Sequence, residues 1–413
     1  MVKGKKLLVL LAVVAIIALV AACSGGNKGT ANEGKLAKIS IFQSKVEIAE
    51  QLEALAQQYT KETGNEVEVW GSVGDAYITQ LQAKLTANQG PSIFSIGYGS
   101  EAETFKSYYY DLSNEPYVKD IAPNMALEID GKVVGVPYGV EGFGLVYNKN
   151  LVNPADVRDL DSFTALLKSF KDQGKNGFSL SQEAYFLIGH ILNTPFALQP
   201  DPQDFIEQLN SGKVKMAETK EFQEFARFLE AIREYAGNPM EITYDKQMGD
   251  FATGKTAIVH QGNWSYGMLA DFGELDFEYG MMPFPLMGND KIAVGQASNW
   301  VINGKAKPEE IEAARAFLNW LFTSETGKNA IVNEFKFVPA MTTIKAENLD
   351  PLSQAVYDAT QSGDTIPWAM NFFPQGIIVN DLAPAAQEFF LNPGMTGEQF
   401  LKKLDEVWTN AVK

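Results

Sequence analysis

A run of eight residues near the middle of the chain matches a phosphate-binding loop, so nucleotide binding is the first chemistry to consider. Residues 249–256, which end in Lys255 and Thr256, fit the pattern G-x-x-x-x-G-K-S/T. Such a loop holds phosphates only where a buried strand precedes it and a helix begins at the Lys-Thr pair. Here polar residues 244–247 precede the match and strand-like residues 257–260 follow it. The context therefore argues against nucleotide binding.

The residue types give little support to metal or nucleophile chemistry. The only histidines, His190 and His260, lie in no H-E-x-x-H pattern and beside no cysteine. A serine nucleophile lacks the G-x-S-x-G turn. A glycoside hydrolase stays open as the alternative, because it needs only two well-placed carboxyl groups among many. Glu141 and Glu183 are the pair to test first.

The sequence feature that does point to a function is a set of aromatic residues beside polar hydrogen-bonding groups. Aromatic faces suit the apolar C–H face of a sugar ring, while Glu, Asn, Lys and Tyr suit its hydroxyls. Covering about 100 Å² of such a face contributes roughly 2–3 kcal/mol. A lone tryptophan is more often core, but several clusters at mostly loop-like positions favour a sugar site. The clusters are residues 183–186, 263–266, 298–300 and 367–373.

Short apolar runs alternate with amphipathic stretches, and this alternation predicts the elements that carry the clusters. Strands are expected at residues 39–42, 67–70 and 93–96, with intervening helices at 48–59, stopping at Gly64, and at 77–85. This β-α-β-α-β order predicts a parallel sheet with helices on its faces. Further strands are expected at 133–136 and 144–147, and helices at 163–170, 205–209, 222–235, 309–322 and 398–408.

Cys23, the only cysteine, stands where an export leader would end. A basic start and an apolar run at residues 7–20 precede it, which is the layout of a signal peptide. That run is shorter than the ~20 residues that span a membrane. Residues 20–23 also resemble the lipobox of bacterial lipoproteins, whose cysteine carries lipid. We therefore expect a signal peptide at 1–22, a flexible tether at 23–35, and lipid on Cys23 that anchors the protein at the extracellular face of the cell membrane.

The amino-acid composition limits the functions and the domain organisation that the rest of the chain can have. A net charge of −17 argues against nucleic acid, whose phosphates need Lys and Arg stripes. It also argues against electrostatic docking on anionic lipid. With 46% hydrophobic residues the chain can bury a large core. A chain of 413 residues is longer than one core usually serves, so two domains are expected.

From residue 38 to nearly the C-terminus, an ordered series of segments resembles the extracellular solute-binding proteins of carbohydrate ABC transporters, the class that includes maltose-binding protein. One of these segments, 251–264, fits F-x-x-G-x-x-A-x-x-x-x-G-x-W and overlaps the false phosphate loop. The others are residues 54–64, 90–94, 131–149, 279–285, 317–326 and 337–340.

The resemblance implies an α/β, two-lobe periplasmic-binding-protein fold of class II. Its lobes are joined by crossing strands and close by hinge motion over a ligand in the cleft. We expect the first lobe at 36–141 with 297–341 and the second at 142–296 with 342–413. The expected role is that of a monomer, without cofactor or catalysis, that presents a mono- or oligosaccharide to an ABC transporter permease. A non-sugar polar solute is a further alternative, while the absence of an Arg or Lys cluster argues against anions.

The resemblance also implies the residues of the ligand site, taken position by position. Trp264 matches the stacking tryptophan of G-x-W and is the strongest candidate. Residues 183–186 match an E-x-Y-F motif that supplies a carboxylate and aromatic rings to the sugar. Gly99 stands where maltose-binding protein has an acidic ligand residue. The full set is Lys45, Glu47, Tyr98, Glu141, Glu183, Tyr185, Phe186, Asn263, Trp264, Trp300, Trp368 and Phe372.

Overall fold

The computed structural model describes residues 35–71, 76–122, 125–296 and 298–413. Residues from Ala37 to Lys413 form one compact unit. The expected signal peptide, Cys23 and all of the tether except Lys35 lie outside the described residues. Within the described ranges, no helix combines the length and apolar character that crossing a membrane requires.

The first sheet has six strands in the order β2-β1-β3-β11-β5-β4. Strand β1 pairs in parallel with β2 and with β3, as the β-α-β-α-β order predicts. Strand β11 runs antiparallel between β3 and β5, so the chain returns to this sheet late in the sequence. The strands are β1 (Ile39–Phe42), β2 (Val67–Trp70), β3 (Ile93–Ile96), β4 (Leu127–Ile129), β5 (Lys132–Pro137) and β11 (Asn299–Ile302).

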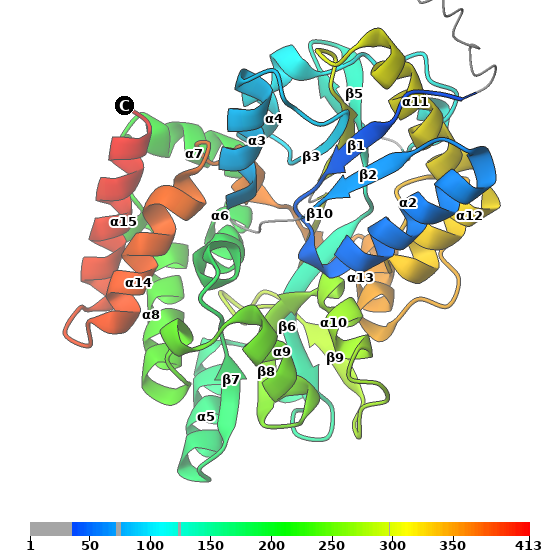
Figure 1. Cartoon of the computed structure of the whole chain (residues 1–413). Helices are drawn as coiled ribbons and strands as arrows, with labels where there is room; N and C mark the ends of the chain where they lie inside the picture. Colours follow the sequence, from blue (N-terminus) through cyan, green and yellow to red (C-terminus); the bar gives the residue numbers. More distant parts are fainter. Residues whose placement is uncertain (1–34, 72–75, 123–124, 297) are drawn as a thin grey trace, which may run out of the picture. The chain divides into compact units, whose positions relative to one another are not determined.

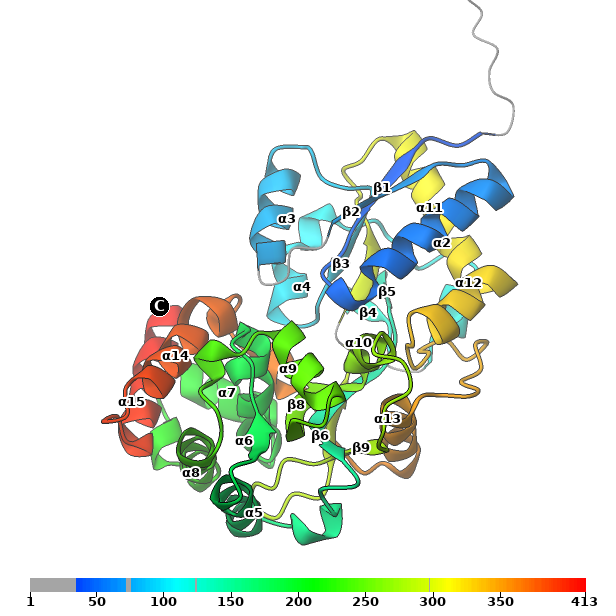
Figure 2. The same cartoon turned by 60° about the horizontal axis from the view of Figure 1, so that its bottom comes forward.

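Helices cover both faces of the first sheet (Figure 1, Figure 2). Helices α2 (Ala49–Thr63) and α11 (Pro308–Thr323) lie on one side, joined by the rings of Tyr59 and Phe317. Helices α3 (Tyr77–Thr86) and α4 (Ser100–Thr104) lie on the other. Helix α12 (Glu325–Asn329) follows α11. The apolar face that predicted α2 is buried, and its expected end is confirmed at Gly64, whose φ of 77° is left-handed.

The second sheet has the order β12-β10-β6-β8-β7, with β9 paired to β6. Every residue of β6 is buried, and this strand is longer than the predicted 144–147 because it begins at Glu141. The strands are β6 (Glu141–Asn148), β7 (Asn176–Ser179), β8 (Thr256–Gly262), β9 (Tyr279–Met282), β10 (Ile292–Gly295) and β12 (Thr365–Ile366). The strands thus divide between two sheets along nearly the ranges expected for the lobes, whose boundaries stay a prediction.

A second group of helices packs with this sheet around one apolar core. All the remaining expected helices are present, each a few residues longer than its apolar pattern. The helices are α5 (Leu160–Asp172), α6 (His190–Ala197), α7 (Pro202–Asn210), α8 (Lys220–Tyr235), α9 (Tyr244–Ala252), α10 (Tyr266–Ala270), α13 (Pro351–Ser362), α14 (Ala383–Leu391) and α15 (Gly397–Ala411).

The match to a phosphate-binding loop falls across a helix-to-strand connection. Gly249 lies inside α9, and Thr256 is the first residue of β8. A phosphate-binding loop has the opposite order, with the strand first and the helix after it. The structure therefore confirms the strand predicted after the match, and it places a helix before the match.

Candidate functional site

A pocket of about 550 Å³ is lined by residues that belong to both sheets and their connections. Its volume lies in the range of small-ligand sites. Two larger hollows of about 1080 and 1030 Å³ also exist. The first adjoins the pocket at Tyr98 and Gln375, and the second lies along α8 and α15. The smaller pocket is the candidate site because aromatic rings and buried polar atoms without partners meet there.

The first sheet contributes residues from the ends of two parallel strands. Ser44, Lys45 and Glu47 follow β1, in a loop and the short helix η1 (Val46–Ile48). Tyr98 follows β3. Because parallel strands end at one edge of the sheet, these side chains converge, which is how open α/β sheets commonly form ligand sites.

The second sheet and its helices contribute the opposite wall. Glu141 is the first residue of β6. Tyr185 and Phe186 lie in the π-helical segment η6 (Tyr185–Gly189), directly after Glu183 and Ala184. Trp264 lies in the short helix η9 (Asn263–Ser265), where β8 ends, and Trp368 precedes η11 (Ala369–Phe372).

Most of the predicted ligand-binding residues meet at this pocket. The residues that line it are Lys45, Glu47, Tyr98, Glu141, Glu183, Tyr185, Phe186, Trp264 and Trp368. The other three predicted residues do not line the pocket. Asn263 is buried beneath it, where its Oδ1 accepts from the Gly142 N–H at 3.0 Å. Trp300 lies in β11 rather than in a loop and stacks on Tyr138 with ring centroids 3.9 Å apart. Phe372 lines the adjoining hollow.

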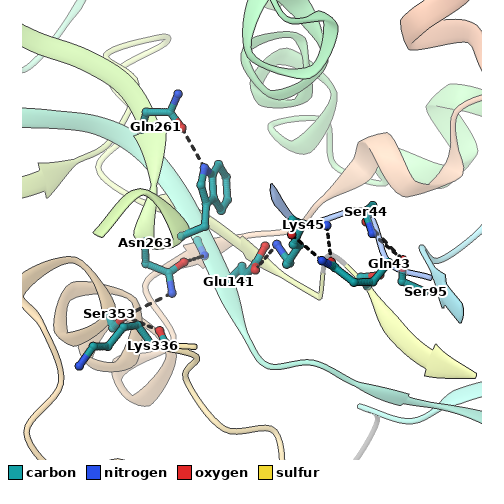
Figure 3. A network of polar contacts seen from close by, with 12 residues as sticks. Gln43, Ser44, Lys45, Ser95, Glu141, Gln261, Asn263, Lys336 and Ser353 are labelled. Carbon is teal, nitrogen blue, oxygen red and sulfur yellow. Dashed lines mark hydrogen bonds and ion pairs between the residues drawn. The ribbon is translucent and has the colours of Figure 1, made fainter. Parts of the chain in front are cut away.

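An ion pair joins the two walls. Lys45 Nζ lies 2.5 Å from Glu141 Oε1, with side chains 10% and 3% exposed (Figure 3). Two hydrogen bonds with the Gln43 amide hold the backbone of Lys45, and the Ser44 N–H donates to Ser95 Oγ at 3.1 Å. Burial lowers the pKa of the Lys45 ammonium, but the Glu141 and Glu47 carboxylates outweigh it, so the net pKa is raised. Lys45 is therefore a fixed cation.

The pocket is otherwise acidic. Among its described lining residues, Lys45 is the sole lysine or arginine, and the carboxylate residues are Glu47, Glu101, Glu141, Glu183 and Asp245. Burial raises the pKa of the Glu47 carboxyl, which Lys45 partly opposes. An anionic ligand would meet repulsion here, as the sequence indicates.

Aromatic rings form the apolar part of the wall. Phe186 and Trp264 are nearly parallel, with an angle of 14° and centroids 6.2 Å apart, and Trp368 is perpendicular to Trp264. The indole N–H of Trp264 donates to Gln261 Oε1 at 2.8 Å, and Gln261 in turn donates to Gln247. The Trp264 ring is therefore held in place before a ligand arrives.

Apart from Glu141 Oε1, whose charge is paired with Lys45, three buried polar atoms at the pocket lack a hydrogen-bond partner in the described chain. They are Glu183 Oε2, Tyr244 Oη and Trp368 Nε1. Glu183 Oε1 is already used, since it accepts from the Tyr244 N–H at 2.9 Å. Burial, together with nearby carboxylates, keeps the pKa of Tyr244 well above its usual value, so its hydroxyl stays a donor. Leaving such an atom unpaired costs about 1–3 kcal/mol, and a ligand bearing hydroxyl groups can satisfy both donors and the acceptor.

Sequence reasoning missed several lining residues, among them Tyr77, His190 and Tyr244. Tyr77 and Tyr244 are the first residues of α3 and α9, so a helix start near the end of the sheet was the available signal. His190 gave no local signal, because its environment depends on residues distant in sequence.

A two-lobe α/β scaffold with a polar and aromatic pocket lined from both of its sheets is the architecture of a protein that binds a small solute. The profile of the bacterial extracellular solute-binding proteins matches residues 54–355, and the chain belongs to this family. It is accordingly a solute-binding protein and not an enzyme, which removes the glycoside hydrolase alternative.

Characterised relatives and solved structures agree with this assignment. A maltooligosaccharide ABC transporter solute-binding lipoprotein of Streptococcus pneumoniae is 25% identical over 338 residues, covering 76% of each chain. The maltodextrin-binding protein MdxE of Bacillus subtilis is 22% identical over 402 residues, covering 89% of each. The raffinose complex of the solute-binding protein RafE has a TM-score of 0.77 at 18% identity and covers 91% of this chain and all of its own. A stachyose complex from Bacillus licheniformis has a TM-score of 0.73 at 20% identity, with the same coverage. The two-lobe fold is therefore established.

Proposed function

We propose that this protein captures an oligosaccharide in the pocket between its lobes and delivers it to an ABC transporter permease. The observation that carries the proposal is the set of unpaired buried atoms, Glu183 Oε2, Tyr244 Oη and Trp368 Nε1, placed among aromatic rings. Sugar hydroxyls both donate and accept, so one ligand class satisfies all three atoms, and its C–H faces cover the rings.

The relatives support the choice of sugar over another polar solute. Two of them are named for maltooligosaccharide and maltodextrin, and two structural neighbours hold raffinose and stachyose. The acidic pocket, whose single described lysine is already paired with Glu141, argues against an anionic ligand.

The proposal includes a lipid anchor on Cys23 and a monomeric state. The Streptococcus pneumoniae relative is named a lipoprotein, which supports the anchor. A tether at residues 23–35 would let the body work beside its permease, and the proposed lobes are 36–141 with 297–341 and 142–296 with 342–413.

Calorimetric titration of the purified full-length protein in detergent tests the proposal. The panel contains maltotriose, raffinose, stachyose and chito- and xylo-oligosaccharides, with chromatography of each mixture afterwards. Binding at about micromolar Kd, near −8 kcal/mol, with unchanged sugar is the expected result. No binding across the panel would contradict the sugar ligand, and released monosaccharide would contradict a binding protein.

A matched pair of tryptophan variants tests the location. Trp264→Ala removes the fixed ring at the pocket, and we expect the binding free energy to fall by about 2–4 kcal/mol. Trp300→Phe is the control, because Trp300 is buried in the first sheet and does not itself line the pocket. This variant should lower the stability without changing affinity. Equal loss of affinity in the two variants would contradict the assigned site.

A further inference from the structure

The two histidines of the chain, which the proposed function does not use, lie against each other at the pocket. His190 is the first residue of α6 and lines the pocket, and His260 is fully buried in β8. His190 Nδ1 is 3.3 Å from His260 Nε2, and His260 Nδ1 is 2.9 Å from the backbone oxygen of Gly144. These contacts form a chain that begins at a carbonyl group and ends at the pocket.

The carbonyl at one end fixes where each proton lies. A carbonyl oxygen only accepts, so the proton of a neutral His260 must be on Nδ1, which leaves Nε2 as an acceptor. His190 must then donate from Nδ1, and its own Nε2 carries a lone pair. His190 makes no other side-chain hydrogen bond within the described residues, and it keeps 6% of its surface exposed. Its free acceptor is thus left to the pocket.

We propose that His190 presents Nε2 to the pocket as a fixed acceptor for one ligand hydroxyl, and that His260 acts as the positioning residue that sets this tautomer. The inference rests on the proposed function for the kind of ligand and deepens it. At this position the pocket would select a group that donates a hydrogen bond and reject a deoxy or O-methyl sugar.

The surroundings keep both rings neutral and hold them still. Burial, then His260 and Lys45, keeps the pKa of His190 well below its usual value. Burial lowers the pKa of His260 to about 4, against a smaller opposing effect of the Gly144 contact. Phe143 stacks on the His190 ring at 15° with centroids 4.5 Å apart, and Trp264 lies at 5.2 Å. A neutral ring in a fixed orientation is what a directional acceptor requires.

Nitrogen NMR of the full-length protein tests the tautomers directly. With histidine labelled with ¹⁵N and no histidine tag, the chain gives only two imidazole spectra, assigned with the single variants. We expect both rings to be protonated at Nδ1 and bare at Nε2 in the ligand-free protein near pH 7. A proton on His190 Nε2, or an imidazolium, would overturn the proposal. This result does not depend on any sugar.

Addition of maltotriose, raffinose or stachyose then tests the ligand contact. Each sugar that binds by calorimetry should shift the His190 Nε2 resonance and leave the His260 Nδ1 proton in place. Binding at saturation without that shift would overturn the role of His190 while leaving the sugar function intact. Failure of all three sugars to bind would instead contradict the sugar ligand itself, and the hydroxyl contact with it.

A pair of His260 variants separates positioning from packing. His260→Gln keeps an acceptor near the Nε2 position, so we expect it to retain the His190 tautomer and the affinity. His260→Asn keeps a donor near Nδ1 but loses that acceptor, and we expect His190 to move its proton to Nε2 and the affinity to fall about tenfold. Equal affinity and equal tautomers in the two variants would overturn the role of His260.

Discussion

At the scale of single residues, the ion pair between Lys45 and Glu141 is the contact with the largest electrostatic consequence. It joins the loop after β1 to the first residue of β6, and both side chains are nearly inaccessible. Removing one member of a buried pair leaves an uncompensated charge, while replacing both by neutral groups of similar size costs much less.

We predict that Lys45→Met lowers the free energy of unfolding by about 3–5 kcal/mol. The double variant Lys45→Met with Glu141→Gln should recover most of that loss, because both charges of the pair are removed together. Urea denaturation at pH 7 measures both. A double variant that is less stable than Lys45→Met would show that the two charges act independently. Lys168→Met is the control, since its pair with Asp172 is exposed, and it should leave the midpoint unchanged.

At the scale of elements, Gly99 controls how closely α4 approaches η11. Its φ of 64° lies in the region that favours glycine, and a Cβ at this position would lie 1.7 Å from the backbone oxygen of Asn371. This contact gives a physical reason for glycine at position 99, since a side chain there would hold the two elements apart.

We predict that Gly99→Ala destabilises the protein and weakens sugar binding, because η11 must move away from the pocket. Gly64→Ala is the control for a positive φ, since φ is 77° there but no atom lies within 4 Å of the added Cβ. The control should lose roughly 1–2 kcal/mol from backbone strain alone. Gly99→Ala should lose about 1–3 kcal/mol more, from the clash and from a ψ of −131° that lies outside the left-handed helical region. Denaturation and calorimetry of both proteins give the comparison. Equal losses would show that the contact with Asn371 does not limit the approach.

The elements were largely predictable because the signals that set them are local. Alternating apolar runs and turn residues placed β1, β2 and β3 at their observed bounds, and Gly64 ended α2 as expected. The late return of the chain to the first sheet through β11 has no local signal. It was expected only from the family resemblance.

The site was less predictable, because neighbouring residues can face opposite sides. Trp264 lines the pocket, whereas Asn263 beside it is turned toward β6 and α13. Trp300 follows Ser298 and Asn299, polar neighbours of the kind expected at a sugar platform, yet it lies in β11, where every residue is buried, and it stacks on Tyr138. The contact between His190 and His260 spans 70 positions in sequence. A contact between residues so far apart in sequence depends on the tertiary fold, so it leaves no local signal in the sequence.

At the scale of the whole molecule, the buried histidines link folding to pH. The pKa of His260 falls from an ordinary 6.5 to about 4 in the folded protein. A lowered histidine pKa gives stability that is fully present above pH 6.5 and is lost as the pH falls toward 4, because the unfolded chain takes up the proton first. Glu47 and Asp350 act in the opposite direction, since burial raises the pKa of both carboxyls.

We predict that His260→Gln loses less stability than the wild type between pH 7 and pH 5. The difference isolates His260 from the carboxyls and should reach about 2 kcal/mol, given 1.4 kcal/mol for each pH unit below 6.5. Guanidinium denaturation at the two pH values measures it. Parallel losses in the two proteins would mean that His260 titrates normally in the folded state.

Attachment to the membrane and binding of the sugar should depend on different parts of the chain. The pocket is built by residues of the compact unit from Ala37 to Lys413, so an anchor at Cys23 should not affect affinity. Each buried CH₂ of a lipid contributes about 0.8 kcal/mol, and two chains give stable attachment.

We predict that Cys23→Ala moves the protein from the membrane fraction to the soluble fraction while its sugar affinity stays unchanged. Fractionation of the expressing bacteria, intact mass of the purified chain and calorimetry measure location, lipid and binding separately. If Cys23→Ala stayed in the membrane with residues 1–22 intact, the apolar run at 7–20 would itself be the anchor. Because the compact unit is the same in both chains, a changed affinity would instead show that the region before Ala37 takes part in binding.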